Sequence, residues 1–129
     1  MKKQKQIIIP TITPLNAEYK LDESAVEKMF SHFSTHNVMP FILGTTGESA
    51  SLPLSIKKTF VRKAAQLETM DTVVYAGIAS NILEESVEFG KYCFDNGVDV
   101  VAANLPSYYA LSNEQIKTYF LQLADALPG

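Results

Sequence analysis

The sequence predicts an α/β fold in which four strand–helix units follow one another along 129 residues. Short apolar segments alternate with longer segments whose apolar residues recur at the helical spacing of about 3.6 residues. The apolar segments are almost uninterrupted, as expected for parallel strands that are buried on both faces. One unit takes roughly 30 residues, which is typical of right-handed parallel crossovers.

The first two units cover the amino-terminal half of the sequence. Residues 7–12 form a short apolar strand, and Asp22 then opens a helix. The apolar face of this helix consists of Val26, Met29, Phe30 and Phe33. The second strand is Phe41-Ile42-Leu43. The apolar face of the helix that follows it consists of Ile56, Phe60, Ala64 and Leu67.

The last two units repeat the pattern at residues 73–77 and 98–103, each followed by a helix. The apolar faces of these helices are Leu83, Val87, Gly90 and Phe94 in the third unit, and Ile116, Tyr119, Phe120 and Leu123 in the fourth. Asn81 with Glu84, and Ser112 with Gln115, have the spacing of capping boxes at helix starts. Asn96-Gly97 predicts a helix end, since glycine adopts the left-handed conformation at low cost.

Four strand–helix units are compatible with two architectures. One is a small open sheet with helices on both faces. The other is the first half of an eight-stranded (β/α)8 barrel, the TIM barrel, which needs about 250 residues in full. A half-barrel would expose an apolar inner face and two strand edges, so alone it is expected either to be marginally stable or to dimerise and cover that surface. The periodicity alone does not choose between the two architectures.

Composition and charge exclude several classes of protein. The net charge of -3 leaves no basic surface for nucleic acid beyond Lys2, Lys3 and Lys5. These lysines precede a very short apolar run that Pro10 interrupts, so no export signal is predicted. No apolar stretch approaches the roughly 20 residues of a membrane span. The single cysteine, Cys93, fits a reducing compartment, and we predict a soluble cytoplasmic protein.

The segment Phe41–Ser49 carries the clearest functional signal. Three apolar residues of a buried strand are followed by Gly44-Thr-Thr-Gly47, and a helical pattern begins shortly afterwards. Such a turn places backbone N–H groups and two hydroxyls at the carboxyl end of a strand. Free N–H groups near a helix start carry partial positive charge, so the turn suits a small carboxylate or phosphate. A tight connection whose glycines only satisfy backbone geometry is the alternative.

Other ligand motifs are not supported. No Gly-Lys-Ser/Thr follows the glycine turn, and no Gly-x-Gly-x-x-Gly follows a strand, so neither a P-loop nor a dinucleotide site is predicted. His32 and His36 have a spacing that can bind a metal, but no carboxylate or cysteine cluster joins them. We therefore predict neither a metal nor a cofactor. Cys93 is predicted to be a small buried hydrophobic residue of a helix.

Several motifs, in order along the chain, resemble those of the pyruvate-dependent aldolases of the dihydrodipicolinate synthase and N-acetylneuraminate lyase family. Pro10-Thr-Ile-Thr-Pro-Leu15 resembles the opening strand and turn, and Gly44-Thr-Thr-Gly-Glu-Ser49 matches the best-known signature. Ala76-Gly77 with Asn81, and Pro106-Ser-Tyr-Tyr109, fit the ends of the third and fourth strands. The resemblance extends over the whole chain and implies the first four βα units of a (β/α)8 TIM barrel.

The resemblance also implies a chemistry and a set of site residues. In that family a lysine on the sixth strand forms a Schiff base with pyruvate, without metal or cofactor. Thr45 and Thr46 match the residues that hold the pyruvate carboxylate, with Gly44 and Gly47 forming the rest of the binding turn. Thr45 also matches a member of a hydroxyl proton relay. Tyr108 matches the tyrosine that completes the relay in a neighbouring subunit, which implies a homo-oligomer.

The resemblance places two essential groups beyond Gly129, namely the Schiff-base lysine and a second relay tyrosine on the fifth strand. The lysines between Gln6 and Gly129 fall in predicted helices, apart from Lys20 in a loop. None has the desolvated setting that a nucleophilic lysine needs. We therefore expect residues 1–129 to be the amino-terminal half of a TIM-barrel aldolase domain, and the sequence leaves open whether this chain alone is an enzyme.

The reaction of the whole protein has two candidates within the family. A synthase that joins pyruvate and aspartate semialdehyde is favoured by Gly-Thr-Thr-Gly-Glu-Ser, and a sugar-acid lyase acting on N-acetylneuraminate or a 2-keto-3-deoxy acid is the alternative. A non-catalytic half-barrel that binds a small carboxylate or pairs with a partner is the alternative from another class. In the synthases, lysine inhibits through a pocket near positions matching Ser49, Asn81 and Glu85. Leu54 and Ser107 replace the usual histidine and tyrosine there, so lysine inhibition is not predicted.

Overall fold

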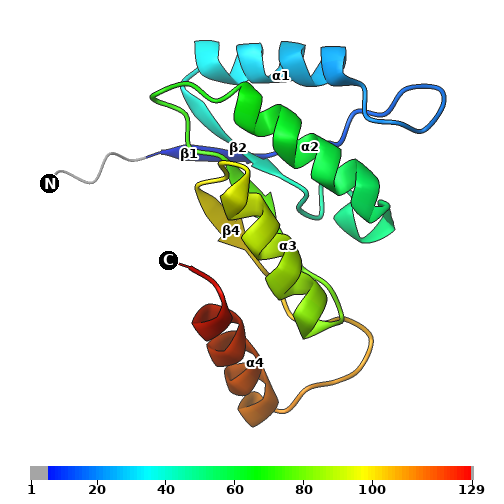
Figure 1. The fold of residues 1–129 in the computed structure, drawn as a ribbon, viewed down its shortest axis with the longest axis vertical. Helices are drawn as coiled ribbons and strands as arrows, with labels where there is room; N and C mark the ends of the chain where they lie inside the picture. The colour runs from blue at the N-terminus through cyan, green and yellow to red at the C-terminus, as the bar shows by residue number, and fades with distance from the viewer. Residues whose placement is uncertain (1–5, 129) are drawn as a thin grey trace, which may run out of the picture.

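The chain folds into a parallel four-stranded sheet with strand order β1-β2-β3-β4 and a helix after each strand (Figure 1). The computed structural model describes residues 6–128, so the lysine-rich start and Gly129 lie outside the described residues. In order along the chain the elements are β1 (Ile7–Pro10), α1 (Glu23–Thr35), β2 (Val38–Ile42), η1 (Ser49–Ser51), α2 (Leu54–Gln66), β3 (Tyr75–Gly77), α3 (Leu83–Asp95), β4 (Val100–Ala102) and α4 (Asn113–Ala126).

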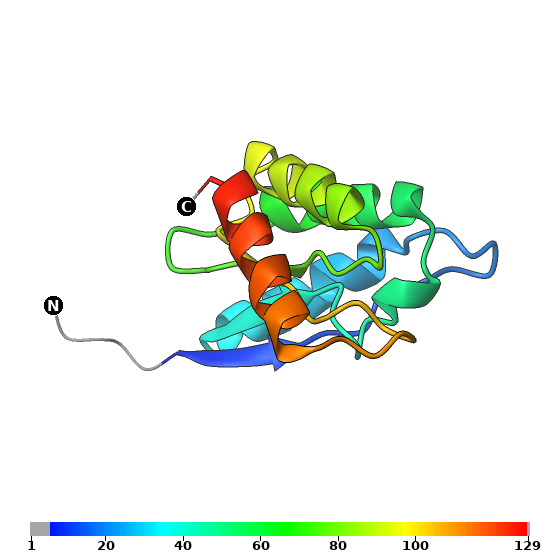
Figure 2. The same cartoon turned by 90° about the horizontal axis from the view of Figure 1, so that it is seen from below.

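The register of the strands defines two different faces of the sheet. Ile42 lies beside Ala76, and Ala76 beside Val101, in a row on the side that packs against the helices, here called the helix face. The neighbouring row, made of Pro10, Phe41, Tyr75 and Val100, lies on the opposite side, here called the open face. Every member of that row is exposed or half-buried, and Figure 2 shows the first three helices on one side of the strands. An open sheet with helices on both faces is therefore wrong, and the half-barrel is correct.

Local signals at three helix ends are confirmed. The Asp22 side chain accepts a hydrogen bond from the N–H of Ala25 and caps α1. Ser112 and Gln115 form both bonds of a capping box at the start of α4. Gly97 follows the end of α3 with a φ of 94°, in the left-handed region that glycine tolerates. Each of these three helix ends is determined by residues that are close together in the sequence.

The predicted capping box of Asn81 with Glu84 is wrong. Helix α3 begins at Leu83 after Ile82, which has no side-chain cap. The Asn81 Oδ1 atom instead accepts hydrogen bonds from the N–H and the hydroxyl of Ser107, at 2.8 and 3.2 Å. Asn81 therefore joins the loop after β3 to the loop after β4, because a distant donor takes its side chain away from the helix.

The strands differ from the predicted segments in length. Strand β2 is longer than expected, because it begins at Val38 and includes Pro40. Proline is unusual inside a sheet, since it has no N–H to donate. The pairing of β2 with β3 starts only at Phe41, so the missing N–H of Pro40 removes no bond to β3. Strands β1, β3 and β4 are shorter than their apolar segments because their ends turn into loops.

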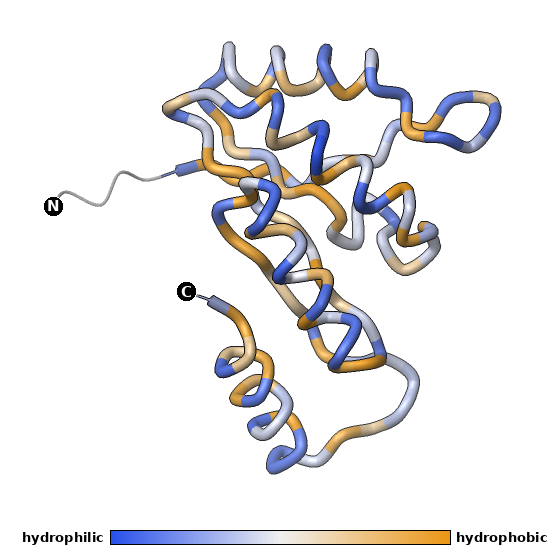
Figure 3. The backbone as a smooth tube through the Cα atoms, viewed as in Figure 1, coloured by the Kyte–Doolittle hydropathy of each residue, from blue (hydrophilic) through white to orange (hydrophobic). Residues whose placement is uncertain are grey.

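The core lies between the helix face and the helices, where the apolar side chains of strands and helices meet. Figure 3 shows hydrophobic and hydrophilic residues alternating along the helices, as expected when one side of each helix is buried. Phe60, Val26, Ile42 and Val74 have no exposed surface. Cys93 is also fully buried, as predicted, and the phenylalanines at 30 and 33 form a tilted aromatic pair in the same core. The predicted apolar faces of the first three helices supply most of these residues, in agreement with their helical spacing.

We expect the thiol of Cys93 to resist modification in the folded protein. Burial raises the pKa of Cys93 to about 12, and the thiolate is the reactive form. A disulfide exchange reagent at pH 8 should therefore label the native protein at least about a hundredfold more slowly than the chain unfolded in denaturant. An exposed cysteine introduced as Ser34→Cys together with Cys93→Ala is the matched control and should react at once. Rapid labelling of native Cys93 would contradict the buried position.

Candidate functional site

The Gly44–Gly47 turn begins directly after β2 and lies between two residues with unusual backbone conformations. Leu43 has a φ of 58° and Glu48 a φ of 53°, and positive φ is rare for residues other than glycine. The Leu43 side chain is almost completely buried, which anchors the start of the turn. The N–H of Glu48 donates to the carbonyl of Thr45 at 3.0 Å and closes the turn. Strained backbone of this kind is frequent at functional sites.

Neighbouring strand ends hold the turn in place. The Thr13 hydroxyl donates a hydrogen bond of 2.8 Å to the carbonyl oxygen of Gly47. A Cβ atom on Gly47 would lie 3.1 Å from the Thr11 carbonyl, and one on Gly77 would lie 2.1 Å from the Leu43 carbonyl. The turn is thus packed against the segment after β1 on one side and the end of β3 on the other, and both glycines are needed for that close approach.

Thr45 and Thr46 lie at the tip of this turn, and both are exposed. Among residues 6–128, no acceptor is found for the N–H of either threonine. Two exposed residues at the carboxyl end of the sheet therefore carry two hydroxyls and two N–H groups that have no acceptor among residues 6–128. Such a group of donors can bind the oxygens of a small carboxylate.

Tyr108 lies in the loop between β4 and α4, at the same end of the sheet as the turn. Its side chain is 90% exposed and its φ is 80°, a third left-handed residue of the site region. The ring meets Tyr109 edge to face, with the ring centroids 4.9 Å apart. Within the described part of the chain, no hydrogen bond joins Tyr108 to the threonine turn. The structure thus brings the four turn residues together and leaves Tyr108 apart from them.

The sequence did not indicate three features of this region. The motif at residues 10–15 includes Thr13 but does not indicate its bond to Gly47. The sequence predicts Leu43 as the last residue of the second strand, whereas its backbone is left-handed. The third feature is a bond of 2.6 Å from the Ser80 hydroxyl to Glu85, which places that carboxylate beside the loop after β3. For Thr13 and Ser80 the sequence offered one signal, because each is a polar residue shortly after a strand.

The lysines of the described chain lie in helices, apart from Lys20, as predicted. One of them differs from the prediction that none is desolvated. Burial lowers the pKa of Lys57 in α2, and the Glu85 carboxylate partly opposes that effect. The Lys63 ammonium in the same helix instead bonds to Glu27 and lies 3.5 Å from Glu23 of α1. Lys57 lies in helix α2. It does not lie at the carboxyl end of a strand, where a lysine would have to lie to face the Gly44–Gly47 turn.

The histidines of α1 interact with each other and with the helix backbone. The Nδ1 atom of His36 is 2.8 Å from the carbonyl oxygen of His32, and the two rings lie 4.3 Å apart at a tilt of 46°. Within residues 6–128, no three His, Cys, Asp or Glu side chains come together as metal ligands would. Each helix in the described part of the chain is too short or too polar to cross a bilayer.

Four βα units whose strands pair in parallel and in sequential order are the arrangement of one part of a TIM barrel. Comparison with known proteins makes the assignment more specific. Residues 3–128 match the Dihydrodipicolinate synthetase family, and the chain belongs to that family. Its sheet and helices correspond to the first βα units of the TIM barrels in that family.

Individual relatives agree with this assignment. The chain is similar to a 4-hydroxy-tetrahydrodipicolinate synthase of Methanococcus maripaludis, with 35% identity over 90% of this chain and 40% of the relative. It is also similar to the 2-keto 3-deoxygluconate aldolase from Picrophilus torridus, with 27% identity, a TM-score of 0.88 and coverage of 95% and 44%. A prophage protein of the dihydrodipicolinic acid synthase family from E. coli K12, solved in complex with pyruvate, has 26% identity, a TM-score of 0.88 and coverage of 95% and 42%. The chain spans about two fifths of the length of the curated relatives that it matches.

Proposed function

We propose that residues 1–129 are the amino-terminal half of a Schiff-base, pyruvate-dependent aldolase. The observation that carries this proposal is the exposed Thr45–Thr46 tip, which offers hydroxyls and N–H groups on a turn packed against two neighbouring strand ends. A carboxylate is the matching ligand, because each donor gains a charge-assisted hydrogen bond. The related prophage protein solved with pyruvate supports a 2-keto acid as that ligand.

The proposed chemistry needs a lysine from the second half of the barrel. The lysine amine attacks the ketone carbon of pyruvate, water leaves, and the resulting iminium acidifies the methyl group. Loss of a methyl proton gives an enamine, whose carbon forms a bond to an aldehyde carbon, and hydrolysis then releases the product and the lysine. In this chain Thr45 would bind the carboxylate and pass a proton, and Tyr108 would complete the relay in a neighbouring subunit of a homo-oligomer.

Two reactions fit this chemistry. The relative from Methanococcus maripaludis supports the synthase reaction of pyruvate with aspartate semialdehyde. The Picrophilus torridus aldolase supports the lyase direction on a 2-keto-3-deoxy sugar acid, and the Pro-x-Tyr-Tyr spacing at Pro106 is closer to the lyase-like members. We favour the synthase because the signature turn reads Gly-Thr-Thr-Gly-Glu-Ser.

A non-catalytic binding function is the second candidate, and the positions of the lysines support it. The described lysines do not lie at the carboxyl ends of the strands, so the chain could act as a half-barrel that binds a small carboxylate without catalysis. Trapping with borohydride separates the two functions. The aldolase proposal expects a reduced pyruvate adduct on a lysine of the second half, in a preparation that contains that half. An adduct on a lysine within residues 1–129 would contradict it.

Pyruvate binding tests the turn directly. We expect Thr45→Val to weaken pyruvate binding by about tenfold to a hundredfold, because a hydrogen bond to a charged group contributes about 1.5–3 kcal/mol. Saturation-transfer NMR during a pyruvate titration measures the dissociation constant of pyruvate for each variant. Thr35→Val is the matched control, since the Thr35 hydroxyl is exposed and bonds only within α1. Equal pyruvate affinity for Thr45→Val and the unchanged chain would remove the turn as the carboxylate site.

A further inference from the structure

The Asn81 side chain joins two loops at the carboxyl end of the sheet. Asn81 follows β3, and its Oδ1 atom accepts hydrogen bonds from the N–H of Ser107 at 2.8 Å and from the Ser107 hydroxyl at 3.2 Å. Ser107 belongs to the loop after β4, 26 residues further along the chain. An amide oxygen has two lone pairs, so one acceptor satisfies both donors of Ser107. The pair of bonds fixes both the position and the direction of the backbone at Ser107.

The loop that carries Asn81 is held by hydrogen bonds of its own. The N–H of Ser80 donates to the hydroxyl of Ser86 at 3.0 Å, and Ser86 is fully buried in α3. The Ser80 hydroxyl donates to the Glu85 carboxylate at 2.6 Å and accepts a bond of 3.2 Å from the N–H of Ile82. Asn81 thus lies between two residues whose backbone N–H groups are both bonded, and its side chain is an acceptor with a defined place.

Tyr108 directly follows Ser107 and has a backbone conformation that it would not keep by itself. Its φ of 80° is left-handed, which is unfavourable for a residue with a side chain. Its ring meets the ring of Tyr109, but both side chains are exposed, so burial does not hold them. A residue in such a conformation persists only where its surroundings enforce it. The two bonds to Asn81 act on the residue immediately before Tyr108.

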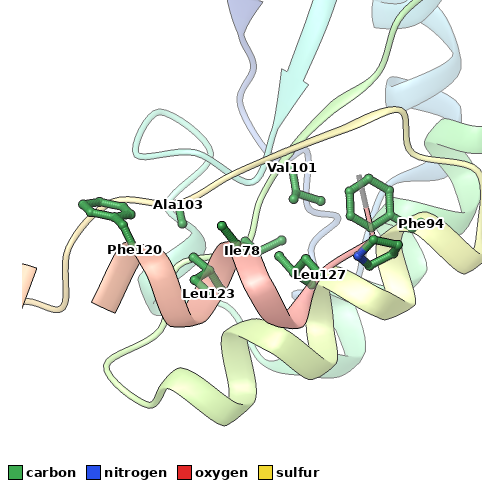
Figure 4. Close-up of a pocket in the computed structure, with 9 residues that line it drawn as sticks. Ile78, Phe94, Val101, Ala103, Phe120, Leu123 and Leu127 are labelled. Carbon is green, nitrogen blue, oxygen red and sulfur yellow. The ribbon is translucent and has the colours of Figure 1, made fainter. Parts of the chain in front are cut away.

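Apolar contacts hold the two ends of this loop, and polar contacts hold its middle. Val101 and Ala103 pack against the core where the loop begins. Figure 4 shows Ala103 on one side of an apolar pocket and Leu123 of α4, the helix that follows the loop, on the other. Among residues 6–128, the two bonds to Asn81 are the only hydrogen bonds that join residues 104–111 to the rest of the chain. The position of the middle of the loop therefore depends on Asn81.

We propose that Asn81 is a positioning residue for Tyr108. Through Ser107 it holds the left-handed backbone that presents the exposed Tyr108 hydroxyl. This role rests on the proposed function, in which Tyr108 completes a proton relay in a neighbouring subunit. A loop that is already in the required conformation loses less conformational freedom when the relay assembles. Asn81 itself touches neither the 2-keto acid nor the relay, and it acts only through the residue that precedes Tyr108.

Amide hydrogen exchange tests the positioning of the loop without any assumption about the reaction. The Ser107 amide should exchange about tenfold faster in Asn81→Leu, because its acceptor is lost. Asn81→Asp keeps an oxygen that accepts from both donors, so the exchange rate should return towards that of the unchanged protein. Asn113→Leu is the matched control, since Asn113 is exposed at the start of α4, and it should leave the rate unchanged. The same Ser107 exchange rate in Asn81→Leu as in the unchanged protein would overturn the proposal.

The exchange of the pyruvate methyl protons for deuterium tests the effect on the relay, in a preparation that contains the second half of the barrel. In D₂O each methyl proton that is lost on enamine formation is replaced by a deuteron, and proton NMR follows the loss of the methyl signal. No aldehyde takes part, so the acceptor need not be known. Asn81→Leu should lower the kcat of this exchange about tenfold. The KM for pyruvate should stay within about twofold, because the threonine turn binds the carboxylate.

A double variant separates positioning from general damage to the fold. When Tyr108→Phe is already present, Asn81→Leu should not lower kcat further, since the hydroxyl that Asn81 positions is absent. An equal fall of kcat with and without Tyr108→Phe would overturn the proposal. So would a normal kcat for Asn81→Leu beside a low kcat for Tyr108→Phe, and the proposed function would then still stand. A normal kcat for Tyr108→Phe would instead remove Tyr108 from the relay of the proposed function, and the Ser107 amide would still decide whether Asn81 holds the loop.

Discussion

Replacing Gly77 with alanine is expected to lower the free energy of unfolding by about 3 kcal/mol. A Cβ atom at this position would lie 2.1 Å from the carbonyl oxygen and 2.8 Å from the carbonyl carbon of Leu43. These are backbone atoms, so no side-chain rotation can relieve the contact. Either β3 must move away from β2, or the turn after Leu43 must change its conformation. Urea denaturation followed by circular dichroism measures the loss.

The same substitution should also affect ligand binding, because the Leu43 backbone leads directly into the threonine turn. We expect Gly77→Ala to weaken pyruvate binding in addition to lowering stability. Gly44→Ala is the matched control for stability, since its Cβ atom would meet only the Phe41 ring at 3.4 Å, an ordinary contact distance. A loss below about 1 kcal/mol for Gly77→Ala would show that β3 and the turn are not in such close contact.

Replacing Phe60 with alanine is expected to cost about 3–5 kcal/mol of stability. Phe60 lies in α2 and has no exposed surface, and it is the largest of the fully buried side chains. Alanine would leave a cavity between α2 and the helix face, and the packed neighbours can fill it only in part. The free energy of unfolding in urea measures this loss, and a fall in the unfolding midpoint should accompany it.

Leu121→Ala is the matched control for Phe60→Ala, because Leu121 of α4 is 54% exposed. We expect its cost to stay within about 0.5 kcal/mol, as for most surface substitutions. If Phe60→Ala destabilised the protein no more than Leu121→Ala, α2 would not be packed on the sheet as described. The intermediate variant Phe60→Leu keeps the experiment interpretable where alanine prevents folding, and its cost should lie between the two.

The helix ends show how much of the fold could be predicted from the sequence. Asp22 caps α1 through the N–H of Ala25, and Ser112 exchanges bonds with Gln115, in both cases three residues away. The same kind of pattern failed at Asn81, because its side chain bonds to Ser107, 26 residues further along the chain. A capping pattern predicts a bond only where no distant partner competes for the same atom.

In the candidate site as well, features that depend on neighbouring residues could be predicted and those that depend on distant residues could not. The residues Gly44, Thr45, Thr46 and Gly47 were identified as one turn from their order in the sequence, and the structure places them in one turn. The left-handed backbone of Leu43, an apolar and bulky residue, could not be predicted, because local preference opposes it. Burial of its side chain and the close approach of Gly77 hold it there.

The sequence by itself determined the alternation of strands and helices and the position of the donor-rich turn, because both depend on residues within a few positions of each other. The tertiary structure decided that the first three helices cover one face of the sheet and that Thr13 bonds to the turn. These features depend on which strands pair and in what register. The pairing is a property of contacts far apart in the chain, for which no local pattern exists.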